Sequence, residues 1–289
     1  MAIVLDNITY TYGVGTPFEK TALKGISVTI ENGEFLGIIG HTGSGKSTFV
    51  QHLNGLLHPT TGKVTVNGVD VSEKTDEAKH MRHKVGMVFQ YPEHQLFEET
   101  IAEDIAFGPK NLGLDAEEVD RRVREAMAFV GLDYDTYAER SPFHLSGGQM
   151  RRVAIAGVVA MEPDFLVLDE PSAGLDPFGR EEIFDEIIKL HKEKDVTVIL
   201  VSHNMEDISR MANRLIVLDK GQIVLDGKPL DIFNHHRHVL QQVGVDVPPV
   251  SVLIESLRNR GLDVSNEVLT VDDAVQALSL IHISEPTRH

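Results

Sequence analysis

The sequence predicts an α/β domain with a mostly parallel sheet, an antiparallel β part at its start, a helical insert and a small C-terminal unit. Three observations predict this fold class. Patterns typical of strands and of helices alternate along residues 34–57 and again along residues 164–212. The strand pattern disappears between residues 100 and 160, where helical spacing replaces it. After Pro229 the strand pattern ends, and a histidine-rich stretch, a pair of prolines at 248–249 and amphipathic helical patterns follow.

The chain opens with three short β-rich runs, at residues 3–12, 22–30 and 34–40. Turn-forming residues at 13–17 and 31–33 separate these runs. Strands joined by such short turns pair antiparallel, so we expect the N-terminal β part to be antiparallel.

The alternating part follows these runs and predicts parallel strands joined by helices. In chain order we expect a helix at 46–57, strands at 85–89 and 164–168, a helix at 179–192, a strand at 196–201, a helix at 205–212, and two strands from Leu215 on that a turn at Lys220 and Gly221 joins.

The helical insert at about 100–160 divides the large domain, which we place at residues 1–228. A C-terminal domain follows at residues 229–278, with amphipathic helices at 250–260 and 271–278, the second capped by Thr270. The last residues, SLIHISEPTRH at 279–289, fit no element. We expect a translated vector or adaptor remnant there, or an ordinary disordered tail.

The composition excludes several classes of protein. A chain of 289 residues with a formal charge of −17 is not suited to broad binding of nucleic acid. The absence of cysteine excludes disulfides and thiolate metal sites. No secretory signal is visible, and the apolar run at 153–161 is about half of the roughly 20 residues that cross a bilayer. We expect a cytosolic chain whose membrane role, if any, comes through a partner.

The segment GHTGSGKST, at residues 40–48, predicts a phosphate-binding loop between a strand and a helix. Its glycines allow the backbone to wrap a polyphosphate. Lys46 would contact the β- and γ-phosphate oxygens, and the Ser47 hydroxyl would bind Mg²⁺. The expected nucleotide-binding residues here are Gly40, His41, Thr42, Gly43, Ser44, Gly45, Lys46, Ser47 and Thr48.

A buried strand, FLVLDEP at residues 165–171, ends in two carboxylates. Burying paired charges is unfavourable unless a metal ion or water takes them. We expect Asp169 to bind Mg²⁺ and Glu170 to deprotonate a water molecule opposite the γ-phosphate. The alternative is a solvated strand end.

Four further residues have weaker signals. Gln90 ends a strand and is a candidate for contacting the metal ion or the attacking water, and His203 follows a strand at the edge where ligands gather on a parallel sheet. Tyr10 and Tyr12 have no evident interior role, and we favour Tyr12 for stacking on adenine. A lone histidine after a strand is more often incidental.

A second glycine-rich helix start lies at residues 146–149, SGGQ. Ser146 can cap the helix, while Gly147 and Gly148 let a negative group approach free backbone N–H donors; Gln149 completes the motif. The chain thus carries two candidate anion sites.

These motifs occur in the order Tyr12, GHTGSGKST, Gln90, LSGGQ, FLVLDE, SAGLD, His203, and together they resemble the nucleotide-binding subunit of ABC transporters over about residues 2–228. Ser172 stands where threonine is commoner in that family. The resemblance implies that two subunits face head to tail, with ATP between the phosphate loop of one and residues 146–149 of the other. Asp176 would lie at that interface.

Residues 90–113 resemble, more narrowly, the A-prime ATPase of energy-coupling factor (ECF) vitamin importers. This implies an ATPase on the cytoplasmic face of the membrane, with three partners: a second ECF ATPase subunit, a transmembrane coupling subunit and a substrate-binding membrane subunit. The region after Pro229 also resembles the domain through which ECF ATPases pair, although a helical cap on the core fits its pattern nearly as well. The alternatives are a soluble ABC ATPase acting on nucleic acid or ribosomes, or an ATPase of another importer class.

Two further stretches are expected at the surface. Tyr91, Leu96 and Phe97 lie among Glu93, Glu98 and Glu99, a composition that suits contact with basic helices of a membrane subunit, unless Leu96 and Phe97 are core residues. The stretch NHHRH at 234–238 suggests a metal site, but adjacent surface histidines are usually solvated.

Overall fold

The computed structural model describes residues 1–279 and contains two sheets. The first is antiparallel, with the order β2-β1-β4-β5, and the second has the order β10-β9-β3-β8-β7-β6. Strand bounds in the first are β1 (Ala2–Tyr12), β2 (Lys20–Glu31), β4 (Thr61–Val66) and β5 (Val69–Asp70). Those in the second are β3 (Phe35–Ile39), β6 (Val85–Val88), β7 (Phe165–Asp169), β8 (Thr197–Val201), β9 (Arg214–Asp219) and β10 (Gln222–Gly227).

The second sheet is parallel except for β10, which pairs antiparallel with β9. Every residue of β3 and β8 is buried, because parallel strands covered on both faces are apolar throughout. The predicted fold class is confirmed. The carboxyl ends of β3, β6, β7 and β8 meet at one edge of this sheet, so the residues that follow these strands gather there.

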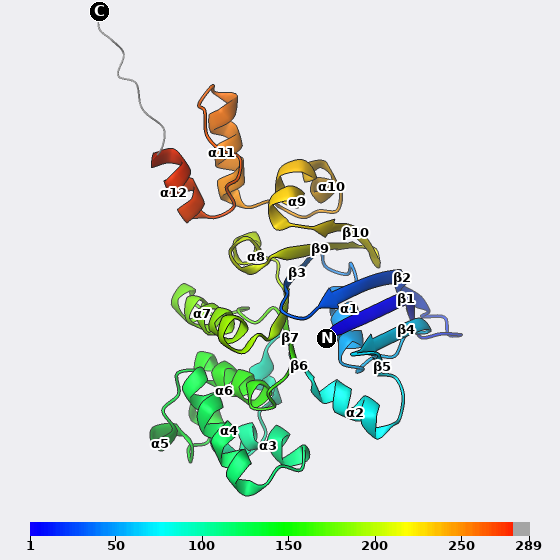
Figure 1. Cartoon of the computed structure of the whole chain (residues 1–289), viewed down its shortest axis with the longest axis vertical. Coiled ribbons are helices and arrows are strands. Elements are labelled where there is room, and N and C mark those ends of the chain that lie inside the picture. Colours follow the sequence, from blue (N-terminus) through cyan, green and yellow to red (C-terminus); the bar gives the residue numbers. More distant parts are fainter. Residues whose placement is uncertain (280–289) are drawn as a thin grey trace, which may run out of the picture.

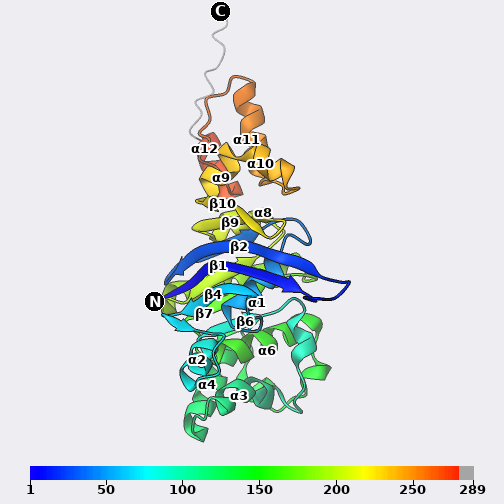
Figure 2. The ribbon, with the colours of Figure 1, turned by 90° about the vertical axis from the view of Figure 1, so that its right-hand side faces the viewer.

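The helices cover the sheet and extend the molecule at both ends (Figure 1). Their bounds are α1 (Lys46–Leu53), α2 (Asp76–His83), η1 (Pro92–Gln95), α3 (Ile101–Asn111), α4 (Ala116–Phe129), α5 (Tyr134–Tyr137), η2 (Pro142–His144), α6 (Gly147–Val159), α7 (Pro177–Lys194), α8 (Met205–Met211), α9 (Pro229–His235), α10 (Arg237–Gln242), α11 (Pro249–Asn259) and α12 (Val271–Ser279). Helices α3 to α6 form the predicted helical insert at one end of the molecule, and α9 to α12 lie at the other (Figures 1 and 2).

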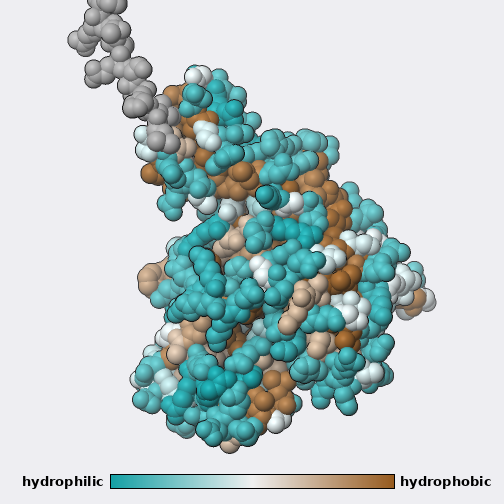
Figure 3. Space-filling view, viewed as in Figure 1, coloured by the Kyte–Doolittle hydropathy of each residue, from teal (hydrophilic) through white to brown (hydrophobic). Residues whose placement is uncertain are grey.

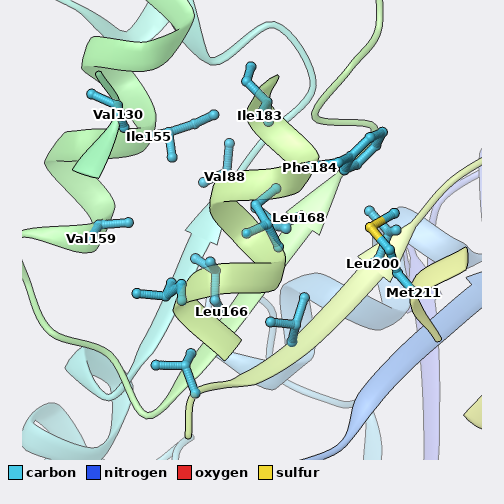
Figure 4. Close-up of a cluster of buried hydrophobic side chains, with 14 of the residues drawn as sticks. Val88, Val130, Ile155, Val159, Leu166, Leu168, Ile183, Phe184, Leu200 and Met211 are labelled. Carbon is cyan, nitrogen blue, oxygen red and sulfur yellow. The ribbon is translucent and has the colours of Figure 1, made fainter. Parts of the chain in front are cut away.

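Two large hydrophobic clusters hold these layers together. One joins the antiparallel sheet and α1 to one face of the parallel sheet. The other joins the opposite face to α7, α8 and the helical insert. In the second cluster, Leu166 and Leu168 of β7 lie near Ile183 and Phe184 of α7, with Ile155 of α6 on the insert side (Figure 4). The insert is therefore packed on the face of the parallel sheet that lies opposite the antiparallel sheet.

The C-terminal helices divide into two parts. Buried side chains of α9 and α10, among them Phe233 and Leu240, belong to the larger cluster of the main domain. Helices α11 and α12 form a small core of their own around Ile254 and Val268. Thr270 accepts a hydrogen bond from the Asp273 backbone N–H, as a helix cap does. The boundary at residue 229 remains a prediction, and the expected tail at 280–289 lies outside the described residues.

Several local features differ from the prediction, which did not include helices α2, α9 and α10. The first helix ends at Leu53 rather than Leu57, because Gly55 adopts a positive φ of 72° that terminates it. The hairpin of β4 and β5 was missed, although Asn67 and Gly68, both with positive φ, form the Asn-Gly turn that is a strong hairpin signal.

Candidate functional site

A cavity of about 580 Å³ lies where the antiparallel sheet meets the carboxyl edge of the parallel sheet. Most of the predicted site residues line it: Tyr12, Thr42, Gly43, Gly45, Lys46, Ser47, Thr48, Gln90, Asp169, Glu170 and His203. The cavity also contains residues that the motifs did not predict, namely Lys20, Thr21, Ala22, Lys24 and Lys220. Three of these are lysines, whose positive charge suits a polyphosphate.

The loop at residues 40–48 owes its shape to glycine. A Cβ on Gly40, whose φ is 154°, would lie 2.3 Å from the Leu218 carbonyl oxygen. Gly45 has a φ of 110° and lies directly before α1. Both positions reject other residues, because L side chains disfavour this backbone region.

Three predicted residues of this loop do not line the cavity. His41 forms a hydrogen bond with Asp219 at 2.9 Å from Nε2 to Oδ1, and Gly40 and Ser44 are buried. The Ser44 backbone carbonyl accepts a hydrogen bond of 2.8 Å from Gly221 N–H. In the structure these residues hold the loop in place; contact with nucleotide stays a prediction.

The Lys46 ammonium turns back into its own loop. Nζ donates hydrogen bonds to the carbonyl oxygens of Gly40 at 2.6 Å and His41 at 3.1 Å. Burial lowers the pKa of Lys46, whereas the nearby Glu170 and Asp169 carboxylates act to raise it. The loop therefore holds a positive charge at the cavity floor.

The paired carboxylates at the end of β7 lie beside this charge. Burial and the neighbouring Asp169 raise the pKa of Glu170 to about 7, against the opposing charge of Lys46. Glu170 Oε1 lies 3.6 Å from His203 Nε2 and makes no hydrogen bond. A poorly paired, half-buried carboxyl with a pKa near neutrality is suited to proton transfer.

Asp169 and Ser47 fit a magnesium ion. Burial raises the pKa of Asp169, although the hydrogen bond from Ser47 and the charge of Lys46 act to lower it. The contact between the two side chains puts a carboxylate and a hydroxyl oxygen together on the wall of the cavity, and Gln90 adds an amide. Oxygen ligands of this kind, completed by phosphate and water, are what Mg²⁺ prefers.

An aromatic cluster lies on the opposite side of the cavity. Tyr12 is 42% exposed, and its hydroxyl forms a hydrogen bond of 3.1 Å with Thr48 Oγ1. Tyr10 packs edge-on against Tyr12 and against the fully buried His52. Only Tyr12 of the two tyrosines lines the cavity, which supports the choice between them. His52 was missed, although its spacing of four residues from Thr48 on α1 places both on one helix face.

The second glycine-rich helix start lies outside this cavity. Ser146 caps α6: its Oγ accepts from Gln149 N–H, and the Gln149 side chain accepts from Ser146 N–H. A Cβ on Gly147 would meet nothing within 4 Å, and one on Gly148 only Leu175 Cδ2 at 3.7 Å. Asp176, predicted at an interface, caps α7 by accepting from Gly179 N–H. Within one chain, the structure does not bring the two predicted anion sites together.

The segment after Gln90 is only partly a free surface. Leu96 is a core residue, as the alternative held, and Glu93 is paired with Arg151, so the expectation that Glu93 faces a partner is wrong. Tyr91 and Phe97 are exposed. Phe97 stacks edge-on with the exposed Phe107 of α3 at 4.8 Å.

The histidine-rich stretch at 234–238 makes no metal cluster. His235 and His236 both pair with Asp231, and residues 1–279 contain no group of three or more side chains of the types that bind metal through histidine, cysteine or carboxylate.

Comparison with known proteins decides the family. Residues 23–173 match the ABC transporter family. The chain belongs to this family. It is 55% identical over 278 residues to the energy-coupling factor transporter ATP-binding protein EcfA2 of Clostridium perfringens, covering 96% of this chain and 97% of that one. It is 52% identical to the EcfA2 protein of Clostridium tetani, covering 99% of both. Within the family, the chain belongs to the ECF ATP-binding proteins, as residues 90–113 predicted.

Solved structures agree with this membership. The cbiO1 protein of Clostridium perfringens, part of the ABC transporter complex cbiONQ, is 34% identical, with a TM-score of 0.72 over 88% of this chain and 98% of that one. A dimeric ATP-binding cassette in a post-hydrolysis state with ADP and Pi is 32% identical, with a TM-score of 0.69 over 78% and 98%. In residues 1–279, no helix is both long and apolar enough to span a bilayer.

Proposed function

We propose that this ECF ATP-binding chain is a Mg²⁺-dependent ATPase that drives uptake of a vitamin or another micronutrient through a membrane complex. The observation that carries the proposal is the cavity in which Lys46, Ser47, Asp169 and Glu170 converge beneath an exposed tyrosine. No other described part of the chain combines a glycine-built phosphate loop with paired carboxylates.

Each residue of the cavity has a role in this proposal. Tyr12 stacks on adenine, and the loop N–H groups bind the phosphates. Lys46 exchanges its carbonyl partners for β- and γ-phosphate oxygens. Ser47, Gln90 and Asp169 would hold Mg²⁺, which would neutralise charge on the phosphates.

Hydrolysis then depends on Glu170. Its carboxylate accepts a proton from the attacking water, for which a pKa of about 7 is well matched. His203, which lies beside Glu170, hydrogen-bonds the γ-phosphate. Gln90 positions the water or the metal ion from the end of β6.

The second glycine-rich start serves a second nucleotide. Gly147 and Gly148 leave the N-terminus of α6 open, so phosphate bound to a facing subunit can approach the N–H donors. We propose that Ser146 to Gln149 complete the site of a second, related ECF ATPase in a heterodimer. Binding of ATP would close both interfaces, and hydrolysis would release them.

Two exposed apolar surfaces support the proposal that this chain binds partner subunits. Val252 and Leu253 of α11, with Val271 and Val275 of α12, are at least half exposed and suit pairing between ATPase subunits. Figure 3 shows hydrophobic side chains among hydrophilic ones on the C-terminal unit, as well as on parts of the main domain.

The other surface lies after Gln90. Tyr91 and Phe97, beside Glu98 and Glu99, suit basic helices of a transmembrane coupling subunit, to which a substrate-binding subunit would attach. The chain would then lie peripherally on the cytoplasmic face of the membrane.

Purification from host membranes in detergent tests the assembly. We expect a related ATPase and two membrane proteins to co-purify. The variant Glu98→Lys/Glu99→Lys should keep ATP binding yet lose the membrane subunits or uncouple hydrolysis from uptake. The variant Glu117→Lys/Glu193→Lys makes the same charge change at exposed positions elsewhere and should keep the complex. Recovery of ribosomes or nucleic acid in place of membrane proteins would overturn the proposal.

A further inference from the structure

Arg151 is a buried arginine that the roles above leave unused. It lies on α6, just after the SGGQ motif, and only 2% of its surface is exposed. Burying a guanidinium is unfavourable unless its donors are paired in good geometry. Its partners therefore show what the position requires.

The guanidinium joins α6 to two other segments. Nε and Nη2 donate to the two carboxylate oxygens of Glu93, at 3.1 and 3.0 Å. Nη1 donates to the backbone carbonyls of Pro171, at 3.3 Å, and of Ala173. Glu93 lies in η1, shortly after Gln90, and Pro171 follows Glu170 directly.

The pKa of Glu93 reflects its contact with Arg151. Burial would raise the pKa of Glu93, but the hydrogen bonds and charge of Arg151 bring that pKa below its ordinary value. The fork of an arginine fixes two oxygens in one plane, which an ammonium does not do. Glu93 is therefore held in one orientation.

Both joined segments contain a non-glycine residue with left-handed backbone. Tyr91 has a φ of 57° and Glu170 a φ of 53°. Such conformations are unfavourable and persist where surrounding contacts hold them. Tyr91 immediately follows Gln90, a predicted catalytic residue, and Glu170 is the proposed base. One guanidinium thus supports the two strained turns that carry Gln90 and Glu170.

We propose that Arg151 is a positioning residue for ATP hydrolysis. By binding Glu93 and the carbonyls of residues 171 and 173, it keeps Gln90 and Glu170 at a fixed separation and ties both to the SGGQ helix. A movement of either turn when the γ-phosphate leaves is then passed to α6 and to η1. This inference rests on the proposed role of Glu170 and extends it.

Turnover in the assembled transporter tests the inference. In Arg151→Met, kcat should fall by about 10- to 100-fold, because a base displaced by a fraction of an ångström loses its alignment, while the Kd for ATP stays within about twofold. Arg151→Lys should recover part of kcat, since an ammonium pairs with Glu93 but cannot also hold both carbonyls. Arg152→Met is the matched control: Arg152 is the next residue and pairs with Glu182 on α7, away from both turns, so kcat should stay within about twofold.

A double variant separates positioning from stability. Arg151→Met alone leaves the Glu93 carboxylate without its partner and should lower the unfolding midpoint. Arg151→Met/Glu93→Met removes both charges and should recover the midpoint, yet kcat should remain low. If kcat recovers together with stability, or if Arg151→Met turns over like the wild type, the inference is wrong.

Hydrogen exchange gives a readout that does not need turnover. The amides of His94 and Ala173, bonded to Tyr91 and Glu170 carbonyls, should exchange faster in Arg151→Met and not in Arg152→Met. Unchanged exchange at both amides would overturn the inference. If the assembled wild-type transporter does not hydrolyse ATP, the proposed function is wrong. That outcome is distinguishable from a failure of the Arg151 inference alone.

Discussion

The two glycine-rich helix starts of this chain use glycine for different reasons. In the phosphate loop, Gly40 and Gly45 have positive φ, and a Cβ on either would lie within 3.0 Å of a backbone oxygen of the same chain. At the start of α6, Gly147 and Gly148 have no such φ and no close neighbour. The fold of the chain itself requires the glycines of the phosphate loop. The glycines at the start of α6 leave the helix N-terminus open, where we propose that phosphate bound to a facing subunit approaches.

We infer from this difference that one site is built within the chain and that the other is completed by a facing subunit, as proposed above. The phosphate loop shares its cavity with two carboxylates, a tyrosine and several lysines. The start of α6 is capped by the side chains of Ser146 and Gln149. It does not line the cavity that contains the paired carboxylates. Four predictions test this comparison, from the largest expected effect to the smallest.

ATP hydrolysis should depend on the residues of the phosphate-loop site. Glu170→Gln keeps the size of the side chain but cannot accept a proton, so kcat should fall by about 10²- to 10⁴-fold. Binding of ATP with Mg²⁺ should survive, because Lys46 and the loop amides are unchanged. Single-turnover hydrolysis together with equilibrium ATP binding measures both. Wild-type turnover in this variant would remove Glu170 from its role.

Nucleotide binding should distinguish the two helix starts. In Lys46→Ala, the affinity of the isolated chain for ATP should fall by about 10- to 100-fold, because charge-assisted contacts to phosphate are lost. Ser146→Arg should leave that affinity unchanged and reduce turnover only in the assembled pair. Photolabelling with an azido-adenine analogue of ATP shows which subunit has bound the nucleotide. If Ser146→Arg abolishes labelling of the isolated chain, the comparison fails.

The two kinds of glycine should respond oppositely to alanine. Gly45→Ala introduces a Cβ at a φ of 110° and 3.0 Å from the Ala22 carbonyl oxygen, which should lower the free energy of unfolding by about 1–3 kcal/mol. Gly147→Ala meets no atom and should leave that free energy unchanged or raise it by less than about 1 kcal/mol. Urea unfolding measures both. In the assembled transporter, Gly147→Ala should nevertheless lower ATP turnover.

Acid should weaken the helix that follows the phosphate loop. Burial lowers the pKa of His52 below 6.5, although its hydrogen bond to the Thr48 carbonyl acts in the other direction. Above pH 6.5 both folded and unfolded states hold His52 neutral, so its contribution to stability is complete. As the pH falls below 6.5 the unfolded chain binds a proton that the folded chain does not, and the unfolding free energy decreases.

The corresponding measurement is urea unfolding between about pH 7.5 and 5.5. The wild type should lose more stability than His52→Gln, by at most about 1.4 kcal/mol per pH unit for one proton. Helix α6 contains no histidine, so no such acid effect is expected at the second helix start. Parallel pH profiles for the two proteins would show that His52 does not titrate differently on folding.

Motif residues were the most predictable part of the site. The spacing of GHTGSGKST and the carboxylates after a buried strand depend on neighbours along the chain, and the cavity contains most of them. The glycine-rich start at 146–149 was predicted as a capped helix, and Ser146 does cap α6. Local chemistry sufficed in each case, because the relevant contacts span only a few residues.

Contacts between distant segments were not predictable. The sequence predicts that Glu93 faces basic helices of a partner, yet Arg151, 58 positions later, binds it. His41, expected at the nucleotide, pairs with Asp219 from another strand, and Lys20 and Lys220 reach the cavity from two sheets. Side-chain type and local spacing contain no information about which of many carboxylates an arginine meets.

The sequence by itself determined the fold class, the order of most strands and helices, and the motif and carboxylate residues that line the cavity, because glycine geometry, hydrophobic periodicity and short motifs act locally. The tertiary structure alone decided that the two helix starts do not share a cavity, that Tyr12 rather than Tyr10 lines the site, and that Arg151 joins the turns carrying Gln90 and Glu170. These outcomes depend on how the antiparallel sheet and the helical insert pack on opposite faces of the parallel sheet, and burial of apolar surface between distant segments sets that packing.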